Sequence, residues 1–234
     1  MPLRFYKFDE YLRMFSIPKK FTQQELDRVK AAVTEAEAKI SGEIVVYYSS
    51  QSADYPQAKY ISALFFIFLK AIGLLVMHEF ILPGTYLFIF HPVVFTLILF
   101  MAGVFGYFAA SYLPFLKQWL VKKQVMANAV RLRSHAVFTE ANVHNTKHKT
   151  GILIYISELE HRVEVIGDLG ISAKVKETEW NGILSAITSG LKSGQRVDGI
   201  CTAVRLCGEL LLKYGFVIEA DDTNELNNDM IIKE

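Results

Sequence analysis

The chain has 234 residues, a formal net charge of +1 and a sequence pI near 7.7, which argues against the strongly basic surface of a nucleic-acid-binding protein. The length allows one or two domains. Hydrophobic residues make up 52% of the chain and the mean hydropathy is +0.25, and much of this excess comes from residues 60–113. We therefore expect one globular domain of ordinary size together with one long apolar segment.

Residues 1–20 alternate apolar and basic side chains, as in Leu3, Arg4, Tyr6 and Lys7. They contain no apolar stretch followed by a small-residue cleavage site, so we expect no signal peptide here. An amphipathic segment of this kind can lie on a membrane surface or pack on the globular domain. The sequence leaves both alternatives open.

A helix followed by a buried strand is predicted for residues 21–59. Thr22 and Glu25 have the spacing of a capping box, which predicts a helix that begins there and ends near Ile40. Residues 43–49, EIVVYYS, form a nearly continuous run of β-branched and aromatic residues. Such a run is typical of a strand that is covered on both faces.

Residues 60–113 are predicted to form a transmembrane helical hairpin. Two apolar runs, Ile61–Leu82 and Tyr86–Tyr112, flank a tight turn at Pro83 and Gly84. Each run is long enough to cross a hydrocarbon core of about 30 Å, which takes roughly 20 helical residues. A segment in lipid must satisfy its own backbone polar groups, so we expect both runs to be helices.

Lys70 lies near the middle of the first apolar run, where a charge costs about 2.5–3.5 kcal/mol on insertion scales. Such a residue can mark a functional site. It can also extend its ammonium group to the interface or face a neighbouring helix, and we favour this second interpretation. Gly103 and Gly106 in the second run are small enough to allow the two helices to pack closely.

The distribution of basic residues predicts the orientation of the hairpin. The segment His78–His91, which includes the turn between the spans, contains Glu79 and no lysine or arginine. The flanks carry Lys59 on one side and Lys117, Lys122, Lys123, Arg131 and Arg133 on the other. By the positive-inside rule, both termini and the globular domain face the cytoplasm, in an inner or plasma membrane. The basic flank could also contact anionic lipid headgroups.

Residues 114–218 are predicted to complete the globular domain, and residues 219–234 form an acidic tail that we expect to be disordered. Asp198 is expected to cap the last helix. The predicted elements in this part are a helix at Lys117–Val137, strands at Gly151–Ser157 and Arg162–Ile166, and helices at Trp180–Leu191 and Gly199–Tyr214. Neither soluble piece has enough strands for a sheet, so we expect residues 43–49 to pair with residues 151–157 in one α/β domain.

Several motifs on both sides of the hairpin resemble the TPM domain family. They are Glu35-Ala36-Glu37, Ser41-Gly42-Glu43-Ile44-Val45-Val46, Ala136-Val137-Phe138, Thr150-Gly151-Ile152-Leu153-Ile154, Val163-Glu164-Val165-Ile166-Gly167-Asp168, Trp180 and Asp198-Gly199. The resemblance covers nearly all of the soluble chain. It implies a Rossmann-like α/β/α sandwich formed by residues 21–59 and 114–218 and interrupted by the hairpin.

The resemblance also suggests functions, because members of the TPM family are implicated in acid phosphatase activity, calcium binding and the assembly or repair of membrane complexes. The chain departs from the family pattern at His161 and at Gly215-Phe216-Val217. We expect an interaction module that helps to assemble or maintain a complex of membrane proteins. The alternative is a metal-dependent, calcium-binding phosphatase.

Asp168 is the principal candidate metal ligand, because it follows a predicted strand in a loop flanked by glycines. Calcium needs several oxygen ligands, and Glu43, Glu160 and Asp54 are candidates for the others. The alternative is that Asp168 only caps a turn, as aspartate commonly does, and we favour this interpretation.

Histidine and cysteine side chains give weaker signals. His144 and His148 have a spacing that suits zinc only on one helix face, and the polar residues around them indicate a solvated loop. Cys201 and Cys207 fall on different faces of a predicted helix, so we expect no disulfide between them.

Overall fold

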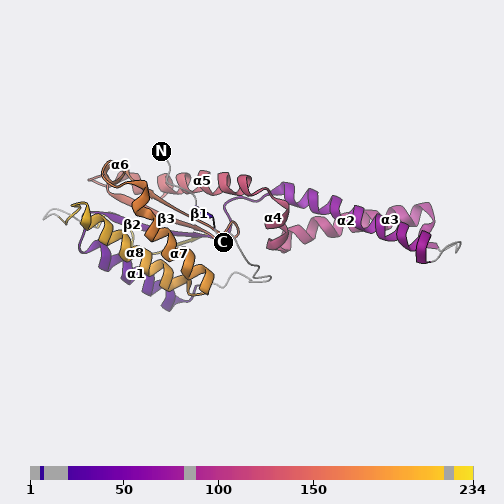
Figure 1. Ribbon diagram of the computed structural model, residues 1–234, viewed down its shortest axis with the longest axis horizontal. Coiled ribbons are helices and arrows are strands. Elements are labelled where there is room, and N and C mark those ends of the chain that lie inside the picture. The colour runs from indigo at the N-terminus through magenta and orange to yellow at the C-terminus, as the bar shows by residue number, and fades with distance from the viewer. Residues whose placement is uncertain (1–5, 8–20, 82–87, 219–223, 234) are drawn as a thin grey trace. The chain divides into compact units, whose positions relative to one another are not determined.

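The computed structural model describes residues 6–7, 21–81, 88–218 and 224–233 (Figure 1). The chain divides into two compact units. The sheet unit comprises Met1–Ala53 and Met126–Glu234, and the hairpin unit comprises Asp54–Val125. The predicted amphipathic segment at residues 1–20 lies outside the described residues except for β1 (Tyr6–Lys7).

The sheet unit contains a mixed sheet of five strands in the order β1-β4-β3-β2-β5. Its centre is the parallel pair β2 (Glu43–Ser49) and β3 (Gly151–Ser157), in which Glu43 is opposite Gly151 and Ser49 is opposite Ser157. The predicted pairing across the hairpin insertion is therefore confirmed. All residues of both strands are buried, as the continuous apolar runs predicted.

The strand β4 (Arg162–Gly167) runs antiparallel to β3, which it follows through a short turn, and β1 extends the sheet antiparallel to β4. At the opposite edge, β5 (Ile231–Lys233) pairs with β2 in parallel. The acidic tail was expected to be disordered, and this prediction is wrong for residues 224–233. They lie along the β2 edge and add a strand to it.

Helices cover both faces of the sheet (Figure 1). One face carries the larger core, in which Ile152, Ile154 and Ile156 of β3 pack with three helices. Leu153 and Tyr155 point to the other face, where Val130 and Val137 of α5 (Lys123–Glu140) cover them. This alternation follows from the two-residue period of a strand. The three helices of the larger core are α1 (Gln23–Glu37), α7 (Asn181–Ser193) and α8 (Arg196–Lys213).

The helix boundaries follow local signals in some places and differ from the predictions in others. The capping box of Thr22 and Glu25 is confirmed at the start of α1. Asp198 does not cap α8, because the helix begins earlier and Asp198 lies in its first turn, 2.5 Å from the Arg28 guanidinium. The single helix predicted at residues 117–137 is instead α4 (Pro114–Leu120) and α5, which Val121 separates with an extended backbone.

The hairpin unit consists of α2 (Pro56–Val76), which continues as the π-helix η1 (Met77–Ile81), the 3-10 helix η2 (Phe88–Phe90), α3 (Pro92–Tyr112) and α4. The stretches Pro56–Ile81 and Pro92–Tyr112 are both long and apolar enough to cross a membrane. Helix α3 ends before Leu113, whose backbone is extended. Proline at position 114 explains this end, because the residue before a proline disfavours the helical conformation.

Helices α2 and α3 pack against each other through small residues. A Cβ added at Gly106 would lie 2.7 Å from the Ser62 carbonyl oxygen and 2.9 Å from the Ala63 Cα. One added at Gly103 would lie 2.9 Å from Ile67 Cδ1. The two glycines thus bring the helices close together, as small residues do at helix interfaces in membranes.

Candidate functional site

Asp168 lies at the end of β4 and caps the short helix α6 (Leu169–Ser172), where its Oδ1 accepts a hydrogen bond of 2.7 Å from the Leu169 amide. It does not lie at the edge of the sheet where the parallel strands β2 and β3 end. Because β4 is antiparallel, its carboxyl end meets the edge at which the parallel strands β2 and β3 begin. The side chain is buried, and its Oδ2 atom has no hydrogen-bond partner within the described residues.

The structure does not bring the four predicted metal ligands together. Glu43 begins β2, at the same edge as Asp168, and accepts hydrogen bonds from the backbone amides of Glu225 and Leu226 at 3.0 and 3.3 Å. Glu160 lies beyond the far end of β3, about 20 Å away at the rise of a seven-residue strand. Asp54 belongs to the hairpin unit. The described ranges contain no group of three or more His, Cys, Asp or Glu side chains that could hold a metal ion.

The two loop histidines are more enclosed than the sequence indicated. His144 lies in the 3-10 helix η3 (Val143–Asn145), His148 follows it, and both are half-buried. The Nδ1 atom of His144 and the Nε2 atom of His148 are buried without a hydrogen-bond partner in the part of the chain that is described. The two cysteines in α8 are free thiols, as predicted, and burial raises the pKa of the Cys207 thiol.

A cluster of hydroxyl groups, which the sequence analysis missed, lies where β2 and β3 end. Ser52 Oγ is 3.0 Å from the Tyr155 hydroxyl and 2.8 Å from Ser157 Oγ. The Glu160 carboxylate accepts hydrogen bonds from the Ser52 amide, at 2.9 Å, and from Ser157 Oγ. Both strands end in serine at paired positions, Ser49 and Ser157, and this is the signal that could have indicated a polar end. These polar groups are hydrogen-bonded to one another, so the cluster links the residues after β2 to the end of β3.

A second buried carboxylate faces α5. Glu164 of β4 accepts a hydrogen bond from Ser134 Oγ, while its Oε1 atom has no partner among the described residues. Burial raises the pKa of Glu164. The strand pattern RVEVI gave no sign of it, because a glutamate between two valines is also typical of a solvent-facing strand position.

The C-terminal tail is held to the sheet unit by a clasp made of Thr34, Glu37, Glu43 and Asn228. The Asn228 amide group donates to Glu37 Oε2 at 2.6 Å and to Thr34 Oγ1 at 3.0 Å. Glu37 also accepts a hydrogen bond of 2.7 Å from the amide of Ile44, at the start of β2. Burial, with a further contribution from the Glu43 charge, raises the pKa of Glu37 to about 8.

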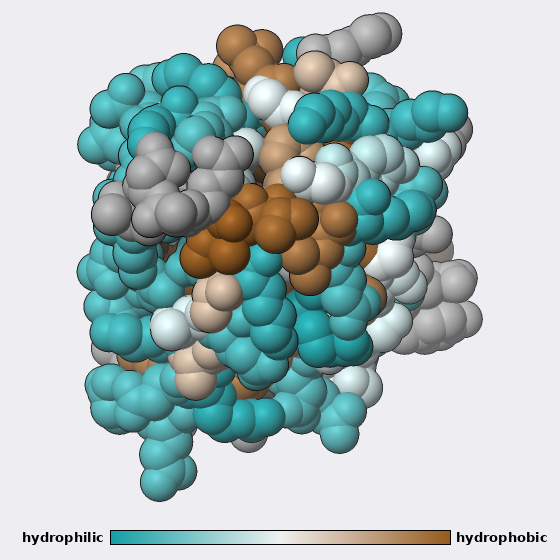
Figure 2. All heavy atoms as spheres, turned by 90° about the vertical axis from the view of Figure 1, so that its left-hand side faces the viewer, coloured by the Kyte–Doolittle hydropathy of each residue, from teal (hydrophilic) through white to brown (hydrophobic). Residues whose placement is uncertain are grey.

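Apolar side chains gather on one end of the sheet unit. Figure 2 shows a hydrophobic patch in the middle of this surface, bordered by hydrophilic residues. The segments at this end include α6 and the C-terminal part of α8 with the residues after it (Figure 1). Their exposed hydrophobic residues are Leu169, Leu212, Val217 and Ile218.

Aromatic and lysine side chains ring one end of the α2–α3 hairpin. Trp119 of α4 is 67% exposed, and its ring lies 5.7 Å from that of Phe65. The rings of Tyr60 and Tyr107 are 5.9 Å apart, and Lys59 Nζ lies 5.8 Å from the centre of the Tyr107 ring. Side chains of this kind collect at the boundary between lipid and water.

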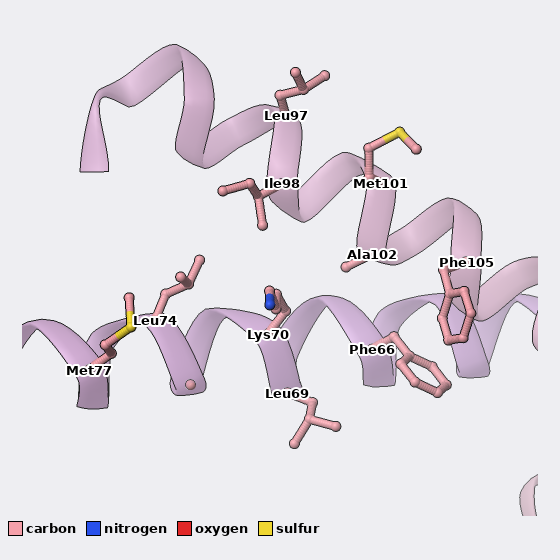
Figure 3. Close-up of a pocket in the computed structure, with 11 residues that line it drawn as sticks. Phe66, Leu69, Lys70, Leu74, Met77, Leu97, Ile98, Met101, Ala102 and Phe105 are labelled. Atoms are coloured by element: carbon pink, nitrogen blue, oxygen red, sulfur yellow. The ribbon is translucent and has the colours of Figure 1, made fainter. Parts of the chain in front are cut away.

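Between α2 and α3 lies a groove of about 730 Å³, and Lys70 is the one charged residue among the described residues that line it. Figure 3 shows Lys70 and Leu74 on the side of α2 that faces Ile98 and Ala102 of α3. Gly73 also lines the groove, and a Cβ added there would meet no atom within 4 Å. The groove is therefore open beside an exposed Lys70.

Comparisons with known proteins identify a similar fold and do not identify a function. No protein-family model matches the chain, and no curated protein does. Among solved structures, the chain is similar to the NMR structure of the BA42 protein from the psychrophilic bacterium Bizionia argentinensis, with a TM-score of 0.55 and 20% sequence identity. The match covers 93% of this chain and 98% of that chain. At this identity, the likeness shows a shared α/β fold.

Proposed function

We propose that the protein is a membrane-anchored interaction module, in which a two-span helical hairpin holds an α/β domain that helps to assemble or maintain a complex of membrane proteins. One observation carries the anchoring. Only 11% and 22% of the most apolar windows of the two long helices are buried, whereas a core helix of a soluble protein would bury most of its apolar surface. A lipid bilayer accounts for the remaining exposed Phe, Leu and Ile side chains.

Two further features support this placement. The ring of Lys59, Tyr60, Tyr107 and Trp119 fits the lipid–water boundary at one end of the hairpin. The basic flanks and the turn without lysine or arginine favour an orientation with the sheet unit in the cytoplasm. We further propose that the sheet unit is a TPM-like, Rossmann-type sandwich, which is supported by the positions of the quoted motifs in β2, β3, β4 and α8.

The assembly role is supported by the surfaces that the protein exposes. The groove around Lys70 and the exposed hydrophobic residues Leu169, Leu212, Val217 and Ile218 provide contact surfaces on the two units. Exposed apolar patches rimmed by polar residues commonly mark protein interaction sites. The two surfaces belong to different units, so one module could contact a partner both in the membrane and outside it.

The anchoring and orientation are tested by thiol labelling of the full chain in intact cells. Cys201 and Cys207 are replaced, and one cysteine is introduced by His91→Cys, between the spans, or by Lys122→Cys, on the basic flank. We expect a membrane-impermeant maleimide to label the first variant in intact cells and the second only after lysis. Recovery of the protein in the soluble fraction, or labelling of Lys122→Cys in intact cells, would contradict the proposal.

The alternative function is a metal-dependent phosphatase, and one observation favours cation binding. The buried Oδ2 atom of Asp168 lacks a hydrogen-bond partner among the described residues, and buried polar atoms rarely remain unpaired. Calorimetric titration of the full chain with calcium and magnesium, repeated on Asp168→Asn, tests this alternative. Binding that the substitution abolishes would support it and justify phosphatase assays. Absence of binding would leave Asp168 as the cap of α6.

A further inference from the structure

The groove around Lys70 presents an unbalanced charge within the apolar part of the hairpin. At 1.5 Å per residue, Lys70 lies about 21 Å along the helix from Pro56 and roughly 16 Å from Ile81. It is therefore far from both ends of the span. A lysine at such a depth is costly, and in membrane proteins it normally faces a polar partner.

The described part of the hairpin supplies no carboxylate at the depth of Lys70. Between Tyr55 and Tyr112 the sequence has one carboxylate, Glu79, which lies about 13 Å further along the helix. Glu79 Oε1 is 3.1 Å from His78 Nδ1, at the end of the span. A second copy of this chain would bring the same residues, so it cannot provide a counter-charge at the depth of Lys70.

The space beside Lys70 has the character of a helix-binding surface. Gly73 stands one turn from Lys70, and an added Cβ there would meet nothing within 4 Å. Ala102 is a second small residue on the α3 side of the groove (Figure 3). Small residues allow another helix to approach closely, and aliphatic walls formed by Leu74 and Ile98 suit its side chains.

We propose that Lys70 and the groove around it bind a transmembrane helix of a partner protein that carries an aspartate or glutamate at mid-membrane depth. The carboxylate pairs with the Lys70 ammonium group, and the absence of a side chain at Gly73 lets the partner helix approach it. The inference rests on the proposed function, because it requires the hairpin to span a bilayer. It specifies the class of partner that the assembly module recognises.

The test uses the full chain, labelled with a fluorescent donor at its amino terminus and reconstituted in phosphatidylcholine vesicles. The probes are synthetic Leu/Ala transmembrane peptides that carry an acceptor dye and one central Glu. A peptide with Gln in place of this Glu is the uncharged control. We expect energy transfer to report association about tenfold tighter for the Glu peptide. The preference should disappear in Lys70→Met, and Gly73→Phe, which fills the groove without removing the charge, should weaken association with the Glu peptide.

A relocated charge provides the matched control. Phe68 is 65% exposed and does not line the groove, so the double variant Lys70→Met/Phe68→Lys keeps a lysine at a similar depth on another face. We expect this variant to lose the preference for the Glu peptide. If it binds that peptide as tightly as the unmodified chain, or if the unmodified chain does not distinguish Glu from Gln, the inference is refuted.

Flotation of the vesicles separates this inference from the proposed function. Protein that fails to float with the vesicles would contradict membrane anchoring itself. Protein that floats but shows no preference for the Glu peptide would contradict only the assignment of Lys70. In that case, Lys70 is tolerated within the span without an acidic partner helix.

Discussion

Replacing Asn228 with alanine should release the C-terminal tail from the β2 edge. Asn228 is 8% exposed, and its amide group donates hydrogen bonds to Glu37 at 2.6 Å and to Thr34 at 3.0 Å. The loss of these two partly buried hydrogen bonds, at about 1 kcal/mol each, weakens the attachment of the tail by about 2 kcal/mol. At 1.4 kcal/mol for each factor of ten, this raises the open fraction of the tail roughly 30-fold.

Hydrogen–deuterium exchange of the full chain measures this opening. The Ser50 amide donates to the Lys233 carbonyl oxygen at 2.9 Å, so it reports directly on the pairing of β5 with β2. We expect Asn228→Ala to accelerate exchange at Ser50 and in residues 224–233, while the central strand β3 keeps its protection. Local opening of this kind is a separate equilibrium from global unfolding.

Asn227→Ala is the matched control, because Asn227 is exposed and its side chain accepts a local hydrogen bond from the Asp229 amide, at 3.0 Å. It should leave exchange at Ser50 unchanged. Equal exchange at Ser50 in Asn228→Ala and in the unmodified chain would refute the clasp. Acceleration throughout β3 would also refute it, since that result would mean that Asn228 stabilises the whole sheet rather than the tail.

Three further predictions concern the hairpin, the clasp and the first helix. Gly106→Leu should destabilise the packing of α2 against α3 by about 1–3 kcal/mol, because its Cβ would lie 2.7 Å from the Ser62 carbonyl oxygen. Steric trapping in bicelles measures this free energy, and Gly73→Leu should change it little because the space beside Gly73 is open. Burial raises the pKa of Glu37 from 4.5 to about 8, so protonated Glu37 stabilises the fold fully below pH 4.5, and this contribution is lost as the pH rises through 8. The free energy of unfolding should therefore fall between pH 4.5 and 8 in the unmodified chain, and this fall should be absent in Glu37→Gln. Thr22→Ala should lower the thermal unfolding temperature by removing the cap of α1, at a cost of about 0.5–2 kcal/mol, and an unchanged temperature would contradict that role.

Features that depend on short-range patterns could be predicted well. The runs EIVVYYS and GILIYIS are continuous and β-branched, and they form the central parallel pair β2 and β3. Thr22 and Glu25 are three residues apart, so their capping box needs no tertiary contact. The two long apolar helices follow from composition alone.

The candidate metal site depended on strand direction, which composition does not specify. Asp168 follows a strand, and only in a parallel sheet would this place it with the carboxyl ends of its neighbours. The short turn after β3 makes β4 antiparallel, so Asp168 and Glu43 share one edge while Glu160 lies at the other. The predicted ligands were compatible in sequence, yet the topology of the sheet separates Asp168 and Glu43 from Glu160.

The amino-acid sequence by itself determined the strands, the capped first helix and the apolar hairpin, because each depends on residues that are close together in the sequence. Only the tertiary structure decided that the C-terminal tail is ordered and which residues surround Lys70. The tail is acidic and polar, and the bonds that hold it join Asn228 to Thr34 and Glu37, which are remote in sequence. The groove around Lys70 exists because α3 folds back along α2, and no local pattern describes the space that two packed helices leave open.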